Sequence, residues 1–256
     1  MVESRGTMTA LAENLKRLEE AIGQACRAAG RERGEVELMA VSKTYPVETI
    51  AEAAGLGLRL FGENRVQEFS SKAGELEGLR RDGAAPVCVH LIGHLQSNKA
   101  QRAAELFDGI DSLDSVRLAE RLNEAAGSLG KRLPVLVEVK LSPEETKEGL
   151  EPESEEMARL LERLPGLEHL KMQGLMTIAP WGAAEEVTRA CFRSLRAWRD
   201  RWAREHAKLE FGVLSMGMSG DFPLAIFEGA TRIRVGTALF GKRAPQMRAV
   251  VPGAGE

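Results

Sequence analysis

The chain has 256 residues, 43% of them hydrophobic, and a formal net charge of −3. This balanced charge argues against a nucleic acid as the main partner, because such partners usually require a basic face. The sequence has no apolar run of membrane-spanning length, and residues 1–8 lack the apolar region of a signal peptide. Three widely spaced cysteines, Cys26, Cys88 and Cys191, fit a reducing compartment. We therefore expect a cytoplasmic protein without a membrane segment.

The N-terminal part of the sequence predicts a helix and then the first strand of a parallel sheet. Apolar residues recur at helical spacing from Leu11 to Cys26, after Thr9 as a candidate cap. Residues 36–43 form an apolar run of strand length that ends on Lys43. Because the carboxyl ends of parallel strands open onto the ligand site, Lys43 is a candidate functional residue. A lysine there can pair with an acid, bind a phosphate, form a Schiff base with an aldehyde, or simply reach water.

The rest of the chain alternates between strands and helices. Strands are predicted at 58–62, 87–93, 109–113, 134–141, 169–177, 211–216 and 233–240, and helices at 47–54, 97–106, 116–126, 157–164, 187–202 and 222–228. About eight such repeats are typical of a (β/α)8 TIM barrel, here with an extra N-terminal helix. The alternative, a doubly wound open sheet, usually has a glycine-rich turn after its first strand, which residues 42–45 do not provide. No linker or low-complexity segment divides the sequence, so we expect residues 1–256 to form a single domain.

Two segments near the C-terminus predict a phosphate-binding site. Residues 214–221 are small and flexible, lie between a strand and a helix, and offer the hydroxyl groups of Ser215 and Ser219. Further on, Gly236 allows close backbone approach, and Thr237 provides an N–H and a hydroxyl group. The loops after strands seven and eight of a barrel frequently hold a phosphate, so position and chemistry agree. The alternative is an ordinary turn in which a polar residue caps the following helix.

A lysine that faces a phosphate cradle across a barrel mouth suggests pyridoxal 5′-phosphate, an aldehyde that carries a phosphate. Six motifs extend this interpretation over nearly the whole chain: AVSK at 40–43, FGENRVQE at 61–68, HLIGHLQSNK at 90–99, GLMT at 174–177, LSMGMS at 214–219 and RVGT at 234–237. In this set and order they resemble the pyridoxal phosphate homeostasis protein family. The barrel of that family is similar to the N-terminal domain of alanine racemase.

The resemblance implies that Lys43 holds the cofactor as a Schiff base. It also implies further cofactor-binding residues, of which the first three hold the phosphate and the others lie close to the cofactor: Ser215, Gly236, Thr237, Asn64, Met216, Gly217 and Arg234. Lys147 looks like the family's second lysine, which is proposed to help move the cofactor in or out. Lys140 stands where the family usually has asparagine, and Glu144 or Glu145 could neutralise its charge.

Arg234 limits the chemistry that this cofactor could support. Arg234 looks like the arginine that contacts the pyridine nitrogen in racemase-like folds. A guanidinium is already protonated and cannot accept a hydrogen bond from a protonated ring nitrogen, so it leaves that nitrogen neutral. Racemisation can still proceed with a neutral ring nitrogen if a base lies on each face of the substrate. The racemase-like enzymes take their second base from a C-terminal β-domain, which residues 242–256 are too few to form. The single tyrosine, Tyr45, lies on the same rim as Lys43.

The expected function is therefore to store or deliver pyridoxal phosphate, with PLP-accepting apo-enzymes as partners, no catalytic residues and at most weak activity. A PLP-dependent amino-acid racemase is the alternative, and a barrel that binds another phosphorylated metabolite without covalent attachment is the third hypothesis. His90 and His94 have no apparent third ligand, so we expect no metal site and a hydrogen-bonded or site-lining imidazole. We further expect a monomer without nucleic-acid or membrane partners.

Overall fold

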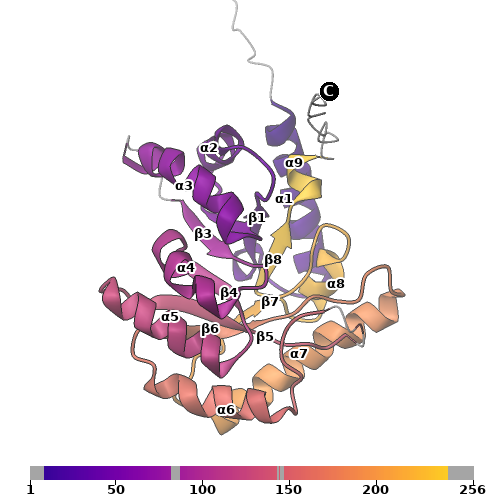
Figure 1. The fold of residues 1–256 in the computed structure, drawn as a ribbon. Helices are drawn as coiled ribbons and strands as arrows, with labels where there is room; N and C mark the ends of the chain where they lie inside the picture. The colour runs from indigo at the N-terminus through magenta and orange to yellow at the C-terminus, as the bar shows by residue number, and fades with distance from the viewer. Residues whose placement is uncertain (1–8, 82–86, 143, 145–146, 242–256) are drawn as a thin grey trace, which may run out of the picture.

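A closed barrel of parallel strands forms the centre of the structure (Figure 1). The computed structural model describes residues 9–81, 87–142, 144 and 147–241. The strands are β1 (Glu37–Val41), β2 (Leu60–Glu63), β3 (Cys88–Leu91), β4 (Gly109–Leu113), β5 (Leu133–Glu138), β6 (Leu170–Met176), β7 (Val213–Ser215) and β8 (Arg232–Val235). They follow one another around the barrel in chain order, and β1 pairs with β8 to close it. The predicted (β/α)8 fold is confirmed.

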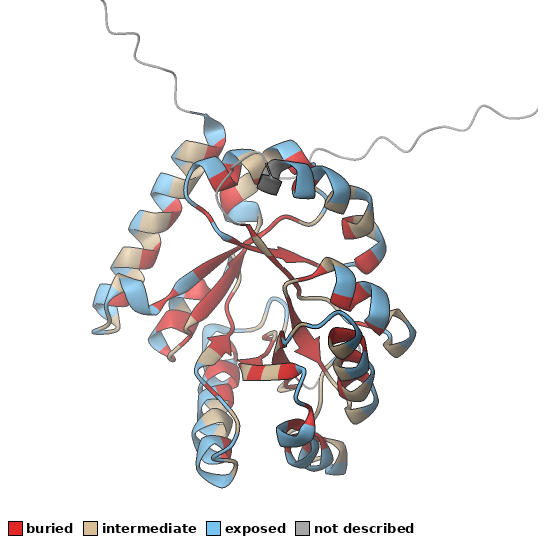
Figure 2. Ribbon diagram, turned by 90° about the vertical axis from the view of Figure 1, so that its left-hand side faces the viewer, coloured by how far each residue is buried: buried red, intermediate tan, exposed pale blue. Residues whose placement is uncertain are grey.

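Helices surround the barrel, and their inner faces complete its core. They are α1 (Ala10–Ala28), α2 (Val47–Gly55), α3 (Val66–Arg81), α4 (Ala100–Leu106), α5 (Val116–Ser128), α6 (Glu155–Arg163), α7 (Glu185–Glu205), α8 (Phe222–Phe227) and α9 (Thr237–Phe240). Figure 2 shows that the strands are largely buried, whereas the helices have buried and exposed faces. Among the described residues, no helix has both the length and the apolar character needed to cross a membrane.

The extra N-terminal helix, α1, lies against α8 and α9. Its predicted cap is confirmed, because the Thr9 hydroxyl accepts a hydrogen bond from the Ala12 N–H at 3.2 Å. The Asn14 side chain donates to the Leu239 carbonyl at 2.9 Å. This helix therefore supports the two short helices that follow the predicted phosphate-binding segments.

Two parts of the chain differ from the sequence-based prediction. Helix α3 was not predicted, because its sequence is mostly polar and its buried contacts depend on a few residues such as Phe69 and Leu76. The strand predicted at 233–240 is wrong beyond Val235. After Gly236 the chain turns into α9, whose first hydrogen bonds run from the Leu239 and Phe240 N–H groups to the Gly236 carbonyl.

Three buried side chains inside the barrel and the exposed Glu37 form a network of charged or titratable groups. His90 Nδ1 lies 2.7 Å from Asp111 Oδ1, and Arg232 Nη1 donates to Asp111 Oδ2 at 3.1 Å. Arg232 Nε donates in turn to Glu37 Oε2 at 2.8 Å. His90, Asp111 and Arg232 are buried, so each charge depends on its partner. The prediction of a hydrogen-bonded His90 imidazole is confirmed.

This network predicts a loss of stability at alkaline pH. Burial alone would lower the pKa of His90, but the charge of Asp111 and the hydrogen bond to it raise that pKa to about 9 from 6.5. Because the folded pKa exceeds the unfolded one, the stabilisation is complete below about pH 6.5 and disappears as the pH rises through about 9. We expect urea unfolding to show a decrease of about 3 kcal/mol at most over this range. The decrease should be absent in His90→Gln and retained in His206→Gln; equal slopes in both variants would contradict the assignment.

Candidate functional site

A cavity of about 850 Å³ lies at the carboxyl-terminal end of the barrel. Five of the eight predicted cofactor-binding residues line it: Lys43, Asn64, Arg234, Gly236 and Thr237. They follow or end three different strands, β1, β2 and β8, so the barrel brings together residues nearly 200 positions apart. Cavities of this size hold small-molecule ligands, and the site has the position typical of barrel enzymes.

The segments after β7 and β8 form one side of this cavity. Gly217 has φ +92°, and a Cβ atom there would lie 2.5 Å from the Cβ of Ala225, so glycine is required. The two segments are joined, because the Ala238 N–H donates to Ser219 Oγ at 3.3 Å and the Arg234 N–H donates to the Gly217 carbonyl at 2.9 Å. Thr237 begins α9 at this side of the cavity, and its N–H and hydroxyl groups suit a phosphate group.

Three of the predicted residues lie behind the cavity wall. Ser215, Met216 and Gly217 are buried and do not line the cavity. The Ser215 hydroxyl accepts a hydrogen bond from Arg234 Nη1 at 2.8 Å, and its carbonyl accepts one from the same atom at 2.7 Å. In this structure Ser215 thus holds Arg234, and its direct contact with a phosphate stays a prediction.

Arg234 places a fixed positive charge on the cavity wall. Its other terminal nitrogen donates to the Thr177 carbonyl at 2.8 Å, so three acceptors fix the orientation of the guanidinium. Burial lowers the pKa of Arg234, against the opposing charges of Asp111 and Glu138. An arginine remains protonated in proteins, so this group can donate hydrogen bonds but cannot act as a base.

The turn that carries Lys43 has an unusual backbone conformation. Thr44 has φ +69°, in the left-handed region that β-branched residues rarely adopt. The turn is closed by a hydrogen bond from the Tyr45 N–H to the Ser42 carbonyl at 3.0 Å. The Tyr45 hydroxyl donates to the Gly241 carbonyl at 2.9 Å, which attaches the turn to the end of α9. The backbone that carries Lys43 is therefore held in one conformation at the end of the barrel.

A smaller pocket of about 220 Å³ adjoins the cavity and shares Asn64, Ile92 and Ile178 with it. Both lysines discussed for the loop after β5, Lys140 and Lys147, line this pocket. Lys147 Nζ lies 3.6 Å from Glu144 Oε2 and 3.5 Å from the Ala179 carbonyl oxygen. Glu144 is therefore paired with Lys147, and Glu145 lies outside the described residues.

Glu138, at the end of β5, also lines the smaller pocket. Burial raises the pKa of its carboxyl group to about 7, although the positive charge of Arg234 opposes the shift. Asp114 and Glu148 add to the negative potential that raises this pKa. The pocket is thus lined by groups of both charges next to the main cavity.

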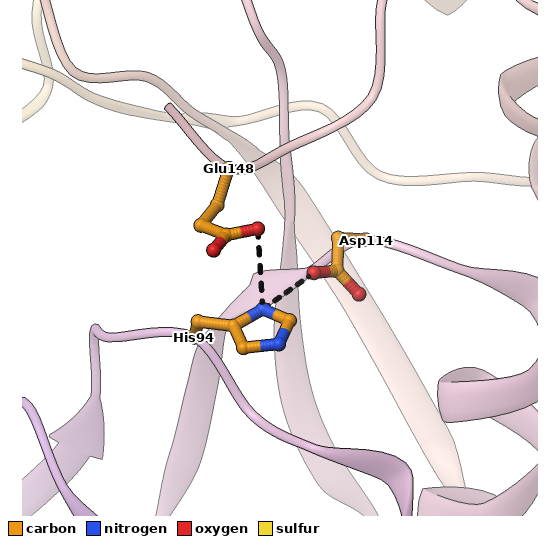
Figure 3. Close-up of side chains that lie close together, drawn as sticks. All are labelled: His94, Asp114 and Glu148. Carbon is orange, nitrogen blue, oxygen red and sulfur yellow. Dashed lines mark hydrogen bonds and ion pairs between the residues drawn. The ribbon is translucent and has the colours of Figure 1, made fainter. Parts of the chain in front are cut away.

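His94 belongs to a cluster that the sequence did not reveal. Its Nδ1 atom lies 3.0 Å from Asp114 Oδ2 and 3.7 Å from Glu148 Oε2 (Figure 3). Within the described residues, this is the one group of three with potential metal-ligand atoms in mutual reach, and His90 is not part of it. Burial raises the pKa of Asp114, while the charge of His94 opposes this. A hydrogen-bonded His94–Asp114 pair accounts for the geometry without a metal ion.

Comparison with known proteins places this site in a family context. The profile of the alanine racemase N-terminal domain family matches residues 8–244. The pyridoxal phosphate homeostasis protein of Aquifex aeolicus is 42% identical over 231 residues, which cover 90% of this chain and 97% of the relative. The protein of the same name from Pseudomonas aeruginosa is 40% identical over 236 residues, covering 92% and 97%.

Solved structures of related sequence and fold resemble this chain as well. PipY of Synechococcus elongatus, solved with PLP bound, superposes with a TM-score of 0.79 at 42% identity and covers 90% of this chain and 100% of PipY. An alanine racemase of Clostridium difficile superposes with a TM-score of 0.68 at 18% identity, covering 91% of this chain but 58% of the racemase. The second comparison concerns the barrel fold alone.

Proposed function

Since this chain belongs to the alanine racemase N-terminal domain family, and within it to the pyridoxal phosphate homeostasis proteins, we propose that it binds pyridoxal 5′-phosphate and serves in its homeostasis. The observation that carries the proposal is the common cavity that Lys43, Gly236 and Thr237 line at the ends of the neighbouring strands β1 and β8. An amine and a phosphate-binding segment in one cavity match the aldehyde and the phosphate of this cofactor.

The described residues fit the cofactor. Gly236 lets the end of β8 approach β1 closely, since an added Cβ there would lie 3.3 Å from the Val41 carbonyl oxygen. Thr237 offers a hydroxyl group there, and the Lys43 amine forms the covalent link. When bound, pyridoxal phosphate supplies an aldehyde for that link and a ring that can accept electrons. Asn64 lines the same cavity at the end of β2.

We propose that the protein stores or delivers the cofactor and is not a strong catalyst. Arg234 cannot provide the proton-accepting partner that keeps the pyridine nitrogen protonated. Tyr45, which follows Lys43 by two positions, uses its hydroxyl to donate to the Gly241 carbonyl and packs against Phe240 with 4.9 Å between ring centroids. These contacts do not favour a second base on the opposite face of a substrate.

The cellular setting is part of the same proposal. The protein acts in the cytoplasm as a monomeric, single-domain carrier, and PLP-accepting apo-enzymes receive its cofactor. Nucleic acids and membranes are not its partners, in agreement with a formal net charge of −3.

An absorbance spectrum of the purified protein mixed with pyridoxal phosphate tests the function. A protonated Schiff base absorbs near the violet edge, and this band should disappear on borohydride reduction. Incubation with single enantiomers of common amino acids then tests for racemase activity. Appreciable enantiomer exchange would contradict the carrier function, and a protein that binds the cofactor without the band would contradict the covalent link.

Thr237→Ala is expected to weaken cofactor retention by about tenfold, because one or two hydrogen bonds to a charged phosphate are lost. Dialysis of the loaded protein, followed by absorbance, measures the retained fraction. Ser128→Ala is a matched control, since the Ser128 hydroxyl donates to the Ala125 carbonyl on α5, outside the cavity. Equal retention by Thr237→Ala and the wild type would place the phosphate elsewhere.

A further inference from the structure

Lys72, on α3, connects the residues on both sides of Lys43. Its Nζ atom lies 3.2 Å from Glu63 Oε1 and 3.2 Å from Glu68 Oε1. Glu63 Oε1 also accepts a hydrogen bond from the Ser42 hydroxyl at 2.7 Å. One ammonium group thus joins β2 and α3 to the residue that precedes Lys43.

The residue that follows Lys43 is attached to the same ammonium group through Glu68. Glu68 Oε1 accepts a hydrogen bond from the Thr44 N–H. Thr44 has φ +69°, a conformation that costs free energy in a β-branched residue and persists only when its surroundings enforce it. Backbone hydrogen bonds and the Glu68 carboxylate supply this constraint. The direction in which the Lys43 side chain points therefore depends on Glu68, which forms an ion pair with Lys72.

Glu63 makes the network sensitive to the loss of Lys72. Its side chain is 0% exposed, and the Lys72 side chain is 12% exposed. Across the described part of the chain, Glu63 Oε2 has no hydrogen-bond partner. Burial raises the pKa of Glu63, and the charge of Lys72 is the largest effect that opposes this shift. Without Lys72, a buried carboxylate beside the Lys43 turn would lose the cation that pairs with it.

We propose that Lys72 is a positioning residue for Lys43: through Glu63 and Glu68 it fixes the Ser42–Thr44 turn so that the Lys43 amine reaches the cofactor aldehyde. The inference rests on the proposed function. In the step concerned, the Lys43 nitrogen bonds to the aldehyde carbon, and the aldehyde oxygen leaves as water with two amine hydrogens. Neither an oxidant nor a reductant is required. Lys72 itself does not line the cavity.

The test separates positioning from cofactor affinity in the full-length apo-protein. The rate of Schiff-base formation is followed by absorbance after addition of pyridoxal phosphate. Affinity is measured with pyridoxine 5′-phosphate, which has the phosphate and ring but no aldehyde. Lys72→Met removes the charge but keeps much of the side-chain volume, Lys72→Arg keeps the charge, and Lys171→Met removes a lysine paired with Glu210 at 3.3 Å outside the cavity.

We expect Lys72→Met to form the adduct about tenfold more slowly, while its affinity for pyridoxine 5′-phosphate changes by less than about twofold. Lys72→Arg should restore most of the rate, and Lys171→Met should match the wild type. If Lys72→Met does not fold, Glu68→Ala takes its place, because Glu68 is partly exposed and its loss frees the Thr44 N–H.

Three outcomes overturn the inference. A wild-type rate in Lys72→Met, or in Glu68→Ala where it replaces that variant, means that the network does not position Lys43. A parallel loss of pyridoxine 5′-phosphate affinity means that Lys72 merely supports the site. If Lys72→Arg is as slow as Lys72→Met, its charge is not what matters. A wild-type protein that forms no Lys43 adduct overturns the proposed function instead, and this inference with it.

Discussion

Replacement of Lys43 by alanine is expected to abolish the covalent adduct with pyridoxal phosphate completely. Lys43 lines the cavity just after β1, and an alanine at this position has no amine to form a Schiff base. The barrel should remain folded, because Lys43 is half-buried on a turn and such substitutions typically change stability by about 1 kcal/mol or less. Borohydride reduction followed by mass spectrometry of the intact protein measures the adduct.

Lys16→Ala is the matched control for this experiment. Lys16 is an exposed lysine on α1 and does not line the cavity, so its variant should form the adduct in full. Circular dichroism shows whether the Lys43→Ala barrel has folded. If folded Lys43→Ala still gains the mass of one reduced cofactor while Lys16→Ala behaves as the wild type, another lysine forms the link.

Asp111→Ala is expected to produce the largest loss of stability, about 3–5 kcal/mol. The Asp111 carboxylate is buried between His90 and Arg232, and the charges of both partners, with the hydrogen bond from His90, hold its pKa low despite burial. Removal of Asp111 leaves the buried Arg232 guanidinium without this carboxylate and takes from buried His90 the partner that keeps it protonated. This costs much more than the loss of one exposed pair. Urea unfolding at neutral pH measures the change.

Glu124→Ala provides a matched comparison. Glu124 pairs with Arg121 at 3.3 Å, and both side chains are largely exposed, at 67% and 60%. Such pairs contribute about 0–1 kcal/mol, so this variant should unfold close to the wild type. Similar losses in Asp111→Ala and Glu124→Ala would mean that the buried network inside the barrel does not stabilise the fold as described.

The sequence predicted the barrel because its strand and helix patterns are local. The apolar run ending at Lys43, and the glycine followed by Thr237, are visible without the structure. Parallel strands then bring these two positions to the same end of the barrel, which the common cavity confirms. The positions of Lys43 and Thr237 could thus be predicted from pattern and topology together.

Side-chain partners across the barrel could not be predicted in the same way. Ser215 follows the phosphate-binding pattern, yet the structure turns its hydroxyl to Arg234, because register between β7 and β8 decides which side chains meet. The contacts of Lys72 depend on how α3 packs against β2, and α3 itself was not predicted. These interactions join residues from different elements, so no local sequence pattern contains them.

A peptide map of the wild-type protein, after incubation with pyridoxal phosphate and borohydride reduction, tests most directly whether Lys43 forms the covalent link. We expect one modified peptide, which carries the reduced cofactor on Lys43. Modification of a different lysine, or loss of the cofactor on reduction with every lysine unmodified, would contradict this expectation.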